Sequence, residues 1–513
     1  MPPCCCCSPL PARAGSSSAA SSRPRSPRSR GERGRPRATA AATIGTLQDP
    51  QPLLADAPRV RDALVSAGWS SAALEDLLGP GFRSHLERGE GAALLRRCGS
   101  GSPLARLARA LVLGLPAEPG LLPASWLGAD GRALVRLQAL HHDGLEVTVP
   151  HDPGEALSQP GADQVLGAGA ASLTLAAATP RQVVGRALDV GCGQGLQAVL
   201  LSDHAHEVVA TDRNPRAVAL TQLAAALAGA DLTTREGDLL EPVTGERFDL
   251  VVSNPPFVVS PRRSYTYRDG GLEGDELCHR LVAGIPALLA PGGHAVLLVN
   301  WLHLQDEDGD DRVRSWFEGT GCDGWVVQRE LADPQEYVTA WLRDTDEARF
   351  DELFDEWVDA LAGVDAVAFG VVALHRRTDG LPPQVVLDVV DQRVAPAWGD
   401  EVLAHFVRRG LLEGDLLQTR LRLRPDVRLH EVAARTDDGW STQTRLLQQE
   451  EGLRWNGAVD GYGASLLAAC DGTHPLAELI GLLAAAIDEP VGVLTEQVLP
   501  VVRRLVEQGF LGP

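Results

Sequence analysis

The sequence contains no lysine, so all 47 of its basic residues are arginine. Lysine supplies the Schiff-base amine of pyridoxal enzymes and the phosphate-binding ammonium group of P-loop ATPases. The absence of lysine therefore excludes both classes of enzyme, together with mechanisms that use a lysine as general base.

Long hydrophobic runs are also absent. Arg, Asp or Gly interrupts even the Leu- and Ala-rich stretches every few positions, whereas a membrane-spanning helix needs about 18 consecutive apolar residues. The nine cysteines consist of one clump, Cys4 to Cys7, and five widely scattered residues. This pattern is neither a secreted disulfide framework nor a metal-binding spacing. We expect a cytoplasmic protein with no membrane partner and no metal.

Composition and periodicity divide the chain of 513 residues into four parts. Residues 1–45 form an Arg-, Ser- and Pro-rich tail that we expect to be disordered, and which is either native or the product of an over-extended start site. Short helical patterns dominate 46–164 and predict a helical N-terminal module that ends in a small wing. Residues 165–378 form the predicted catalytic domain. Residues 379–513 form an extension that ends in a winged-helix-like module, for which we expect a structural or protein-binding role.

The formal charge of the whole chain is −21, although the tail is basic. The remainder is therefore still more acidic than the whole, and it repels phosphate backbones unless a local basic patch compensates. This charge disfavours a nucleic-acid substrate without excluding one. No motif indicates an oligomeric state.

Within the catalytic domain, short apolar segments alternate with helical ones, which is typical of βαβ units and a mostly parallel sheet. The strand candidates are RALDVG, HEVVATD, DLTTREGD, FDLVVSNPP and GHAVLLVNW. Two further candidates, WVVQREL and AVAFGVVALHRR, flank an acidic helix near 346–362 and predict a pair of edge strands.

The first strand candidate leads into a glycine-rich turn, LDVGCGQG, with Gly191, Gly193 and Gly195. Glycines here let the backbone approach a ligand where a Cβ atom would clash. The dinucleotide fingerprint requires glycine at the position of Leu196. The spacing of the glycines therefore disfavours NAD as the cofactor. An acidic residue, Asp189, lies just before the turn.

This segment resembles class I methyltransferases, whose first strand ends in an acidic residue followed by the same glycine pattern. The resemblance implies a Rossmann-like fold with a mostly parallel, seven-stranded sheet and the cofactor S-adenosyl-L-methionine. It places Asp189 near the methionine ammonium group of the cofactor. Asp238 would contact the adenine amino group, and Leu239 would flank the adenine ring.

Asp212 ends the second strand candidate, about twenty residues beyond the turn, where a carboxylate can accept hydrogen bonds from both ribose hydroxyls. An alternative role for Asp212 is as N-cap of the following helix, and both roles can hold together.

The fourth strand candidate ends in Asn-Pro-Pro-Phe, and this motif resembles that of methyltransferases that modify planar NH2 groups. The nitrogen lone pair of such a group is delocalised, so two hydrogen-bond acceptors must hold the nitrogen for attack. The side-chain oxygen of Asn254 and the carbonyl oxygen of Pro255 would be these acceptors. Pro255 and Pro256 would stiffen the segment, and Phe257 would stack on the planar group.

The motif and the later DGGLEG run resemble protein-glutamine methyltransferases that modify release factors, over about Val184 to Trp301. In those enzymes the motif ends in Tyr where this chain has Phe257. The resemblance implies transfer to a protein glutamine amide. Between the Asn-Pro-Pro-Phe motif and the DGGLEG run lies a segment in which Arg262, Arg263 and Arg268 are interleaved with tyrosines. We expect this segment to form a lid over the substrate.

Several alternatives stay open. The arginines and tyrosines of the predicted lid also suit a ribosomal RNA, transfer RNA or DNA methyltransferase that acts on guanine N2 or adenine N6. A small-molecule acceptor fits the motif as well. A further hypothesis is a non-catalytic binding scaffold. Three intact site residues argue against it, namely Asp189, Asp212 and Asn254.

Overall fold

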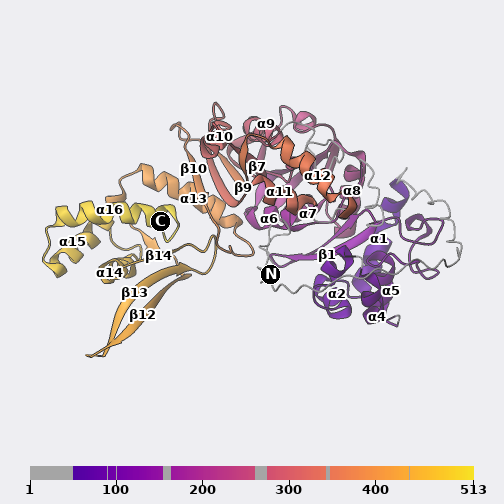
Figure 1. The fold of residues 1–513 in the computed structure, drawn as a ribbon, viewed down its shortest axis with the longest axis horizontal. Helices are drawn as coiled ribbons and strands as arrows, with labels where there is room; N and C mark the ends of the chain where they lie inside the picture. Colours follow the sequence, from indigo (N-terminus) through magenta and orange to yellow (C-terminus); the bar gives the residue numbers. More distant parts are fainter. Residues whose placement is uncertain are drawn as a thin grey trace, which may run out of the picture.

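A computed structural model describes most of the chain after the basic tail (Figure 1). The described residues are 50–88, 90–99, 101–153, 163–259, 274–342, 347–437 and 439–513. The predicted lid and most of the DGGLEG run therefore lie outside the described residues, as does the tail. Within these ranges, none of the helices combines the length and apolar character needed to cross a membrane.

The centre of the molecule is an eight-stranded sheet in the order β10-β8-β9-β7-β6-β3-β4-β5. Its strands are β3 (Val184–Val190), β4 (Ala205–Asp212), β5 (Thr233–Glu236), β6 (Phe248–Ser253), β7 (Leu289–Leu304), β8 (Cys322–Ala332), β9 (Val364–Arg376) and β10 (Val385–Val389). Strands β3 to β7 are parallel neighbours, whereas β9 runs antiparallel to both β7 and β8. The prediction of a mostly parallel sheet is confirmed.

Two details of the sheet differ from the expectation. The sheet has eight strands where seven were expected, because β10 adds in parallel to the outer side of β8. Strand β8 is therefore not at the edge, and β9 lies between β7 and β8, so neither is the edge strand that its sequence suggested. The segment VVLDV of β10 is too short to predict a strand by itself. Its pairing depends on the backbone edge of β8 that β9 does not use.

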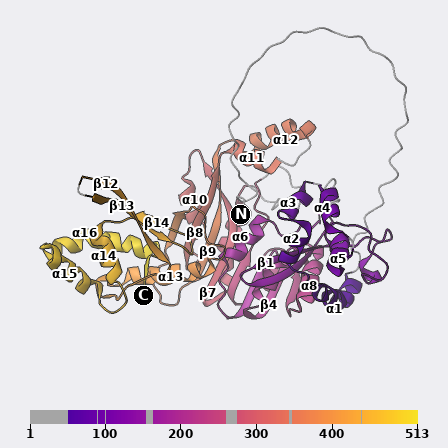
Figure 2. The same ribbon diagram turned by 90° about the horizontal axis from the view of Figure 1, so that it is seen from below.

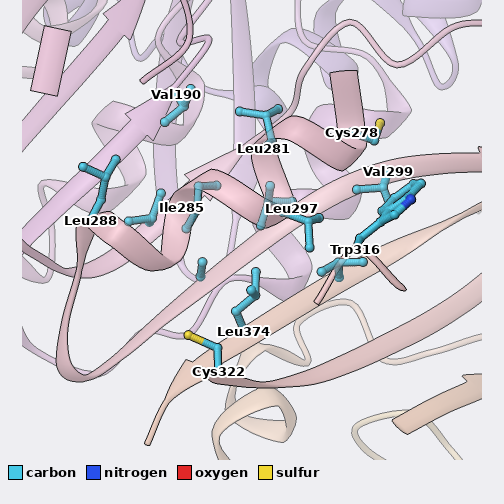
Figure 3. Packing of buried hydrophobic residues seen from close by; sticks show 14 of the residues in the cluster. Val190, Cys278, Leu281, Ile285, Leu288, Leu297, Val299, Trp316, Cys322 and Leu374 are labelled. Atoms are coloured by element: carbon cyan, nitrogen blue, oxygen red, sulfur yellow. The ribbon is translucent and has the colours of Figure 1, made fainter. Parts of the chain in front are cut away.

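Helices cover both faces of the sheet. The first face carries α6 (Ala170–Ala178), α7 (Leu196–Leu201), α8 (Pro215–Ala228) and α13 (Gly399–Glu413), and the second carries α9 (Glu276–Gly284), η4 (Ile285–Leu288) and α10 (Gly309–Ser315). Figure 3 shows the second face, where Leu281 and Ile285 point toward Leu297 of β7. Short η3 (Glu241–Val243) precedes β6. The apolar strand residues are buried on both sides, as parallel sheets require.

A helical hairpin between β8 and β9 stands apart from these layers (Figure 2). It consists of α11 (Pro334–Leu342) and α12 (Glu347–Ala360), which pack on each other and on a third apolar cluster. This cluster includes Val258 and Val259, which directly follow the Asn-Pro-Pro-Phe motif. The helical hairpin therefore lies against the end of the predicted chemistry site.

Among the described residues, the N-terminal part contains five helices, a 3-10 turn and a two-stranded hairpin (Figure 1). They are α1 (Gln51–Ser66), α2 (Ser71–Leu78), α3 (Phe82–Glu87), α4 (Gly91–Cys98), α5 (Pro103–Leu111), η1 (Ala124–Trp126), β1 (Arg136–His142) and β2 (Leu145–His151). Helix α1 and η1 share an apolar cluster with α8 of the sheet layer. The N-terminal part is thus packed on the helix that follows β4.

The C-terminal part lies at the opposite end of the molecule (Figure 1). Its elements are η5 (Leu416–Gln418), β11 (Arg422–Leu423), β12 (Val427–Thr436), β13 (Gly439–Gln449), β14 (Asn456–Ala458), α14 (Gly461–Ala469), α15 (Leu476–Ile487), α16 (Val491–Glu507) and β15 (Leu511–Gly512). Helices α14, α15 and α16 follow one another in the segment for which a winged-helix-like module was expected. Strands β12 and β13 form a long ribbon that projects from the body.

An ion pair joins the N-terminal part to α8. Arg216 Nε lies 2.8 and 2.7 Å from the two carboxylate oxygens of Asp152, and Asp152 also accepts the backbone amide of Val165 at 2.8 Å. The side chain of Asp152 is 5% exposed. Removing one partner of a buried pair leaves the other charge uncompensated.

We expect Asp152→Ala to lower the free energy of unfolding by about 3 kcal/mol, since it strands the Arg216 guanidinium in a buried place. The matched control is Asp62→Ala, because the side chain of Asp62 is 77% exposed and its ion pair with Arg61 is long, at 3.8 Å. The control should cost less than about 1 kcal/mol. Urea unfolding of both variants measures the difference, and equal midpoints would contradict the structural role of the Asp152 pair.

Candidate active site

The predicted cofactor residues lie at the carboxyl ends of three neighbouring strands. Register pairs Asp189 of β3 with Ala210 of β4, and Asp212 of β4 with Glu236 of β5. The carboxyl ends of adjacent parallel strands form the ligand crevice of doubly wound sheets. The structure therefore brings Asp189, the glycine turn and Asp212 together.

The glycine turn adopts a backbone that other residues rarely take. Gly191, Gly193 and Gly195 have φ values of +75°, +54° and +87°. A Cβ atom on Gly191 or Gly193 would meet nothing within 4 Å among the described residues, whereas one on Gly195 would lie 2.9 Å from Thr221 Cα. The first two glycines thus border open space, and the third allows close packing of α7 on α8.

Two carboxylates flank this open turn. Asp189 is buried and accepts the backbone amide of Ala198 at 3.0 Å. Burial raises the pKa of Asp189 to about 7, and repulsion from Asp212 adds to the shift. Burial also raises the pKa of Asp212, although the amides of Asn214 and Gly193, which it accepts at 2.8 and 3.0 Å, oppose the shift. Two desolvated carboxylates that repel each other suit a cationic ligand.

The helix that follows Asp212 is capped by a different residue. Asn214 is the N-cap of α8, and its side chain accepts the backbone amide of Arg216 at 2.9 Å. The alternative role of Asp212 as this N-cap is therefore wrong. Asp212 instead accepts the amide of Gly193 in the glycine turn with one oxygen and the amide of Asn214 with the other.

Asp238 and Leu239 follow β5 at the same edge of the sheet. Asp238 is exposed, while Leu239 is partly buried against the cluster on the second face. Leu239 has a φ of +47°, which is uncommon for a residue other than glycine. The structure thus places an exposed carboxylate and an apolar side chain side by side after the third strand.

The Asn-Pro-Pro-Phe segment starts where β6 ends. Strand β6 pairs with β3 so that Ser253 lies opposite Val190, and the Ser253 hydroxyl donates to the Val190 carbonyl at 2.9 Å. Asn254 consequently follows directly beside the glycine turn. The chemistry motif and the cofactor residues share one edge of the sheet, as expected from the sequence.

The side chain of Asn254 has a partner that the sequence did not reveal. Its amide nitrogen donates to the hydroxyl of Ser172 on α6 at 3.2 Å. The carbonyl oxygen of the same Ser172 accepts the Gln197 side chain of α7 at 2.7 Å. Ser172 therefore links Asn254 to the helix after the glycine turn, with the amide nitrogen of Asn254 on the Ser172 hydroxyl.

The other motif residues are held by apolar packing. Pro255 is buried, and Phe257 packs against all three apolar clusters around the sheet. The ring centroid of Phe257 lies 5.3 Å from that of Phe369 on β9, with the rings tilted by 47°. The position of the Phe257 ring is thus set by residues that are distant in sequence.

The described residues show no set of side chains that could bind a metal ion. Among the described ranges, no group of three or more His, Cys, Asp or Glu side chains is arranged to hold a metal ion. Cys192 lies inside the glycine turn, and burial raises the pKa of its thiol well above the usual value. Such a thiol is a poor nucleophile.

Comparisons with known proteins agree with this geometry. Residues 162–308 match a family model described as the methyltransferase small domain. Two other models, each described as a domain of unknown function, match residues 66–150 and 403–513. The predicted methyltransferase class is thereby confirmed for the segment that contains β3 to β7.

The curated relatives match over part of the chain. A release factor glutamine methyltransferase of Geobacter sulfurreducens is 38% identical over 28% of this chain and 52% of its own length. A ribosomal RNA small subunit methyltransferase C of Alcanivorax borkumensis is 35% identical over 23% of this chain and 32% of its own length. The chain thus spans about half or less of these two relatives.

Among solved structures, a 16S rRNA N2 G1207 methyltransferase of T. thermophilus covers 42% of this chain and 53% of its own. Its sequence identity is 22%, and its TM-score is 0.25.

The third glycine of the turn generates a prediction. We expect Gly195→Ala to lower the free energy of unfolding by about 2 to 4 kcal/mol, because the methyl group would combine a left-handed backbone with a clash against α8. The control is Gly191→Ala, which has the same backbone strain but open space, and which should cost only about 1 to 2 kcal/mol. Equal losses in urea unfolding of the two variants would mean that close packing at Gly195 is unimportant.

Proposed function

We propose that this protein transfers a methyl group from S-adenosyl-L-methionine to a planar NH2 group, and that the acceptor is a protein glutamine amide. The proposal depends on the methyltransferase domain in residues 162–308 and on its Asn254 site. One observation carries the choice of a planar nitrogen, namely that Ser172 holds the Asn254 amide by its nitrogen. With its nitrogen on Ser172, the oxygen of that amide would accept an N–H of the substrate.

The cofactor fits the chemistry of the first half of the site. When bound, S-adenosyl-L-methionine supplies an electrophilic methyl group on a sulfonium and carries a cationic ammonium group. Asp189 and Asp212, with pKa values raised by burial, would be stabilised as carboxylates by such a cation and would accept its hydroxyl and ammonium hydrogens. The open backbone at Gly191 and Gly193 leaves room for a ligand to approach.

The acceptor would be held by the second half of the site. Asn254 Oδ1 and the Pro255 carbonyl oxygen would accept the two N–H groups of the amide, and Phe257 would pack on its planar face. This arrangement aims the nitrogen lone pair at the methyl group. The nitrogen–methyl bond forms as the sulfur–methyl bond breaks, and the proton leaves the methylated nitrogen afterwards, so no general base is needed before transfer.

A protein acceptor is favoured over a nucleic acid by charge. The helical hairpin beside the motif presents exposed carboxylates on α12, at Asp351, Glu352, Asp355 and Asp359. A phosphate backbone that approached this side would meet them as like charges. Relatives named for release factor glutamine methylation support the same choice.

A nucleic-acid base is the second candidate acceptor. Relatives named as ribosomal RNA methyltransferases share the matched segment, and the arginine-rich run at 262–268 would offset the acidic helix. The acceptor amine would be guanine N2 or adenine N6, held by the same two oxygens. The product of the reaction separates the two candidates.

The first experiment is transfer of labelled methyl groups into a host lysate, followed by separate protease and nuclease digestion. We expect protease to release the label, and loss of label to nuclease would contradict the protein acceptor. Asn254→Ala should reduce transfer about a hundredfold, because one of the two positioning acceptors is lost. The control measurement is cofactor affinity, which should change less than twofold in this variant.

The raised pKa of Asp189 predicts a pH dependence of cofactor binding. Because a cationic ligand favours the ionised carboxylate, affinity should rise as the pH rises through about 7. Titration calorimetry should give a dissociation constant about tenfold larger at pH 6 than at pH 8, one pKa unit corresponding to a factor of ten. Asp189→Asn should bind more weakly and lose this difference, and an unchanged pH profile in Asp189→Asn would show that another group titrates.

A further inference from the structure

The segment that carries the Asn-Pro-Pro-Phe motif ends beneath the α11–α12 hairpin. Val258 and Val259 are 7% and 8% exposed, and they share their apolar cluster with Val338, Leu353 and other residues of that hairpin. Figure 2 shows that α11 and α12 lie at one side of the sheet. The hairpin thus packs on the residues that follow the motif and on Leu302, Ala332 and Val367 of β7, β8 and β9.

One polar contact joins the hairpin to the backbone of this segment. The backbone amide of Val259 donates to the hydroxyl of Tyr337 at 2.9 Å. Tyr337 is 6% exposed, so neither group can exchange this partner for bulk water. A buried amide without a partner costs about 1 to 3 kcal/mol, and the chain is therefore held at this position.

Tyr337 is itself held firmly. It lies in the first turns of α11, whose start is capped by Asp333, since Asp333 Oδ1 accepts the amides of Gln335 and Glu336 at 2.8 and 2.9 Å. The side-chain nitrogen of the buried Asn300 on β7 donates to the Tyr337 hydroxyl at 3.5 Å. The hydroxyl is therefore tied to the central sheet as well as to its own helix.

The motif has three polar attachments in sequence order. Ser253 is bonded to β3 at the start, the Asn254 side chain is bonded to Ser172, and Val259 is bonded to Tyr337 at the end. Between the last two lie Pro255 and Pro256, whose rings restrict backbone rotation. Displacement at Val259 would consequently be passed back to the carbonyl of Pro255.

We propose that Tyr337 is a positioning residue for methyl transfer. Its hydroxyl fixes the end of the Asn254–Val259 segment, and so sets where the Pro255 carbonyl and the Phe257 ring meet the acceptor. This inference rests on the proposed function, and it assigns a catalytic task to a hairpin between β8 and β9. A positioning role predicts a loss in turnover with little change in binding.

The test is Tyr337→Phe, which removes the hydroxyl and keeps the ring in its apolar cluster. With the labelled-methyl assay, kcat should fall about tenfold, while KM for the acceptor and the cofactor affinity should each change less than twofold. Tyr462→Phe is the matched control, because Tyr462 is 59% exposed on α14, and it should retain full turnover. Full turnover in Tyr337→Phe would overturn the proposal.

A second measurement does not depend on turnover. Hydrogen exchange of the peptide that contains Val259 should be slow in the unaltered protein and about tenfold faster in Tyr337→Phe, with exchange elsewhere unchanged. Fast exchange at Val259 in the unaltered protein, or the same rate in both proteins, would overturn the inference. If the unaltered protein methylates no acceptor, the proposed function fails, while the exchange result still decides whether Tyr337 holds the segment.

Discussion

The parallel register of β3 with its two neighbours determines where every candidate site residue lies. Pairing of Asp189 with Ala210 on one side, and of Val190 with Ser253 on the other, brings three strand ends to one edge. A shift of one residue in either pair would turn the inward side chains to the opposite face. The burial of both faces of these strands makes such a shift costly, so the core of the sheet is what keeps the site together.

The proposed site divides into a cofactor half and an acceptor half, which would depend on different interactions. The cofactor half is electrostatic, because Asp189 and Asp212 keep raised pKa values beside an open glycine turn. The acceptor half is geometric, because Asn254 and Phe257 are placed by a serine hydroxyl and by aromatic packing. In this protein without lysine, arginine supports the structure at other places, as Arg216 does.

The sequence predicted the parts of the fold that local patterns encode. Strands β3 to β9, the glycine turn and the edge shared by Asp189 and Asn254 follow from apolar runs that end in polar residues. Ser172, Tyr337 and β10 were not predicted, since each acts through contacts with segments far away in the chain. A serine in an Ala-rich helix and a tyrosine after an acidic turn carry no motif, and the N-cap of α8 is Asn214, two residues beyond Asp212.

The family match ends at residue 308, just after β7, whereas the sheet continues through three more strands. Strand β9 pairs with β7 from His294 to Leu304, so a protein cut at the boundary of the match would expose the full edge of β7. An uncovered edge of this length invites aggregation. Any fragment made for expression should therefore extend at least through Val389, the end of β10.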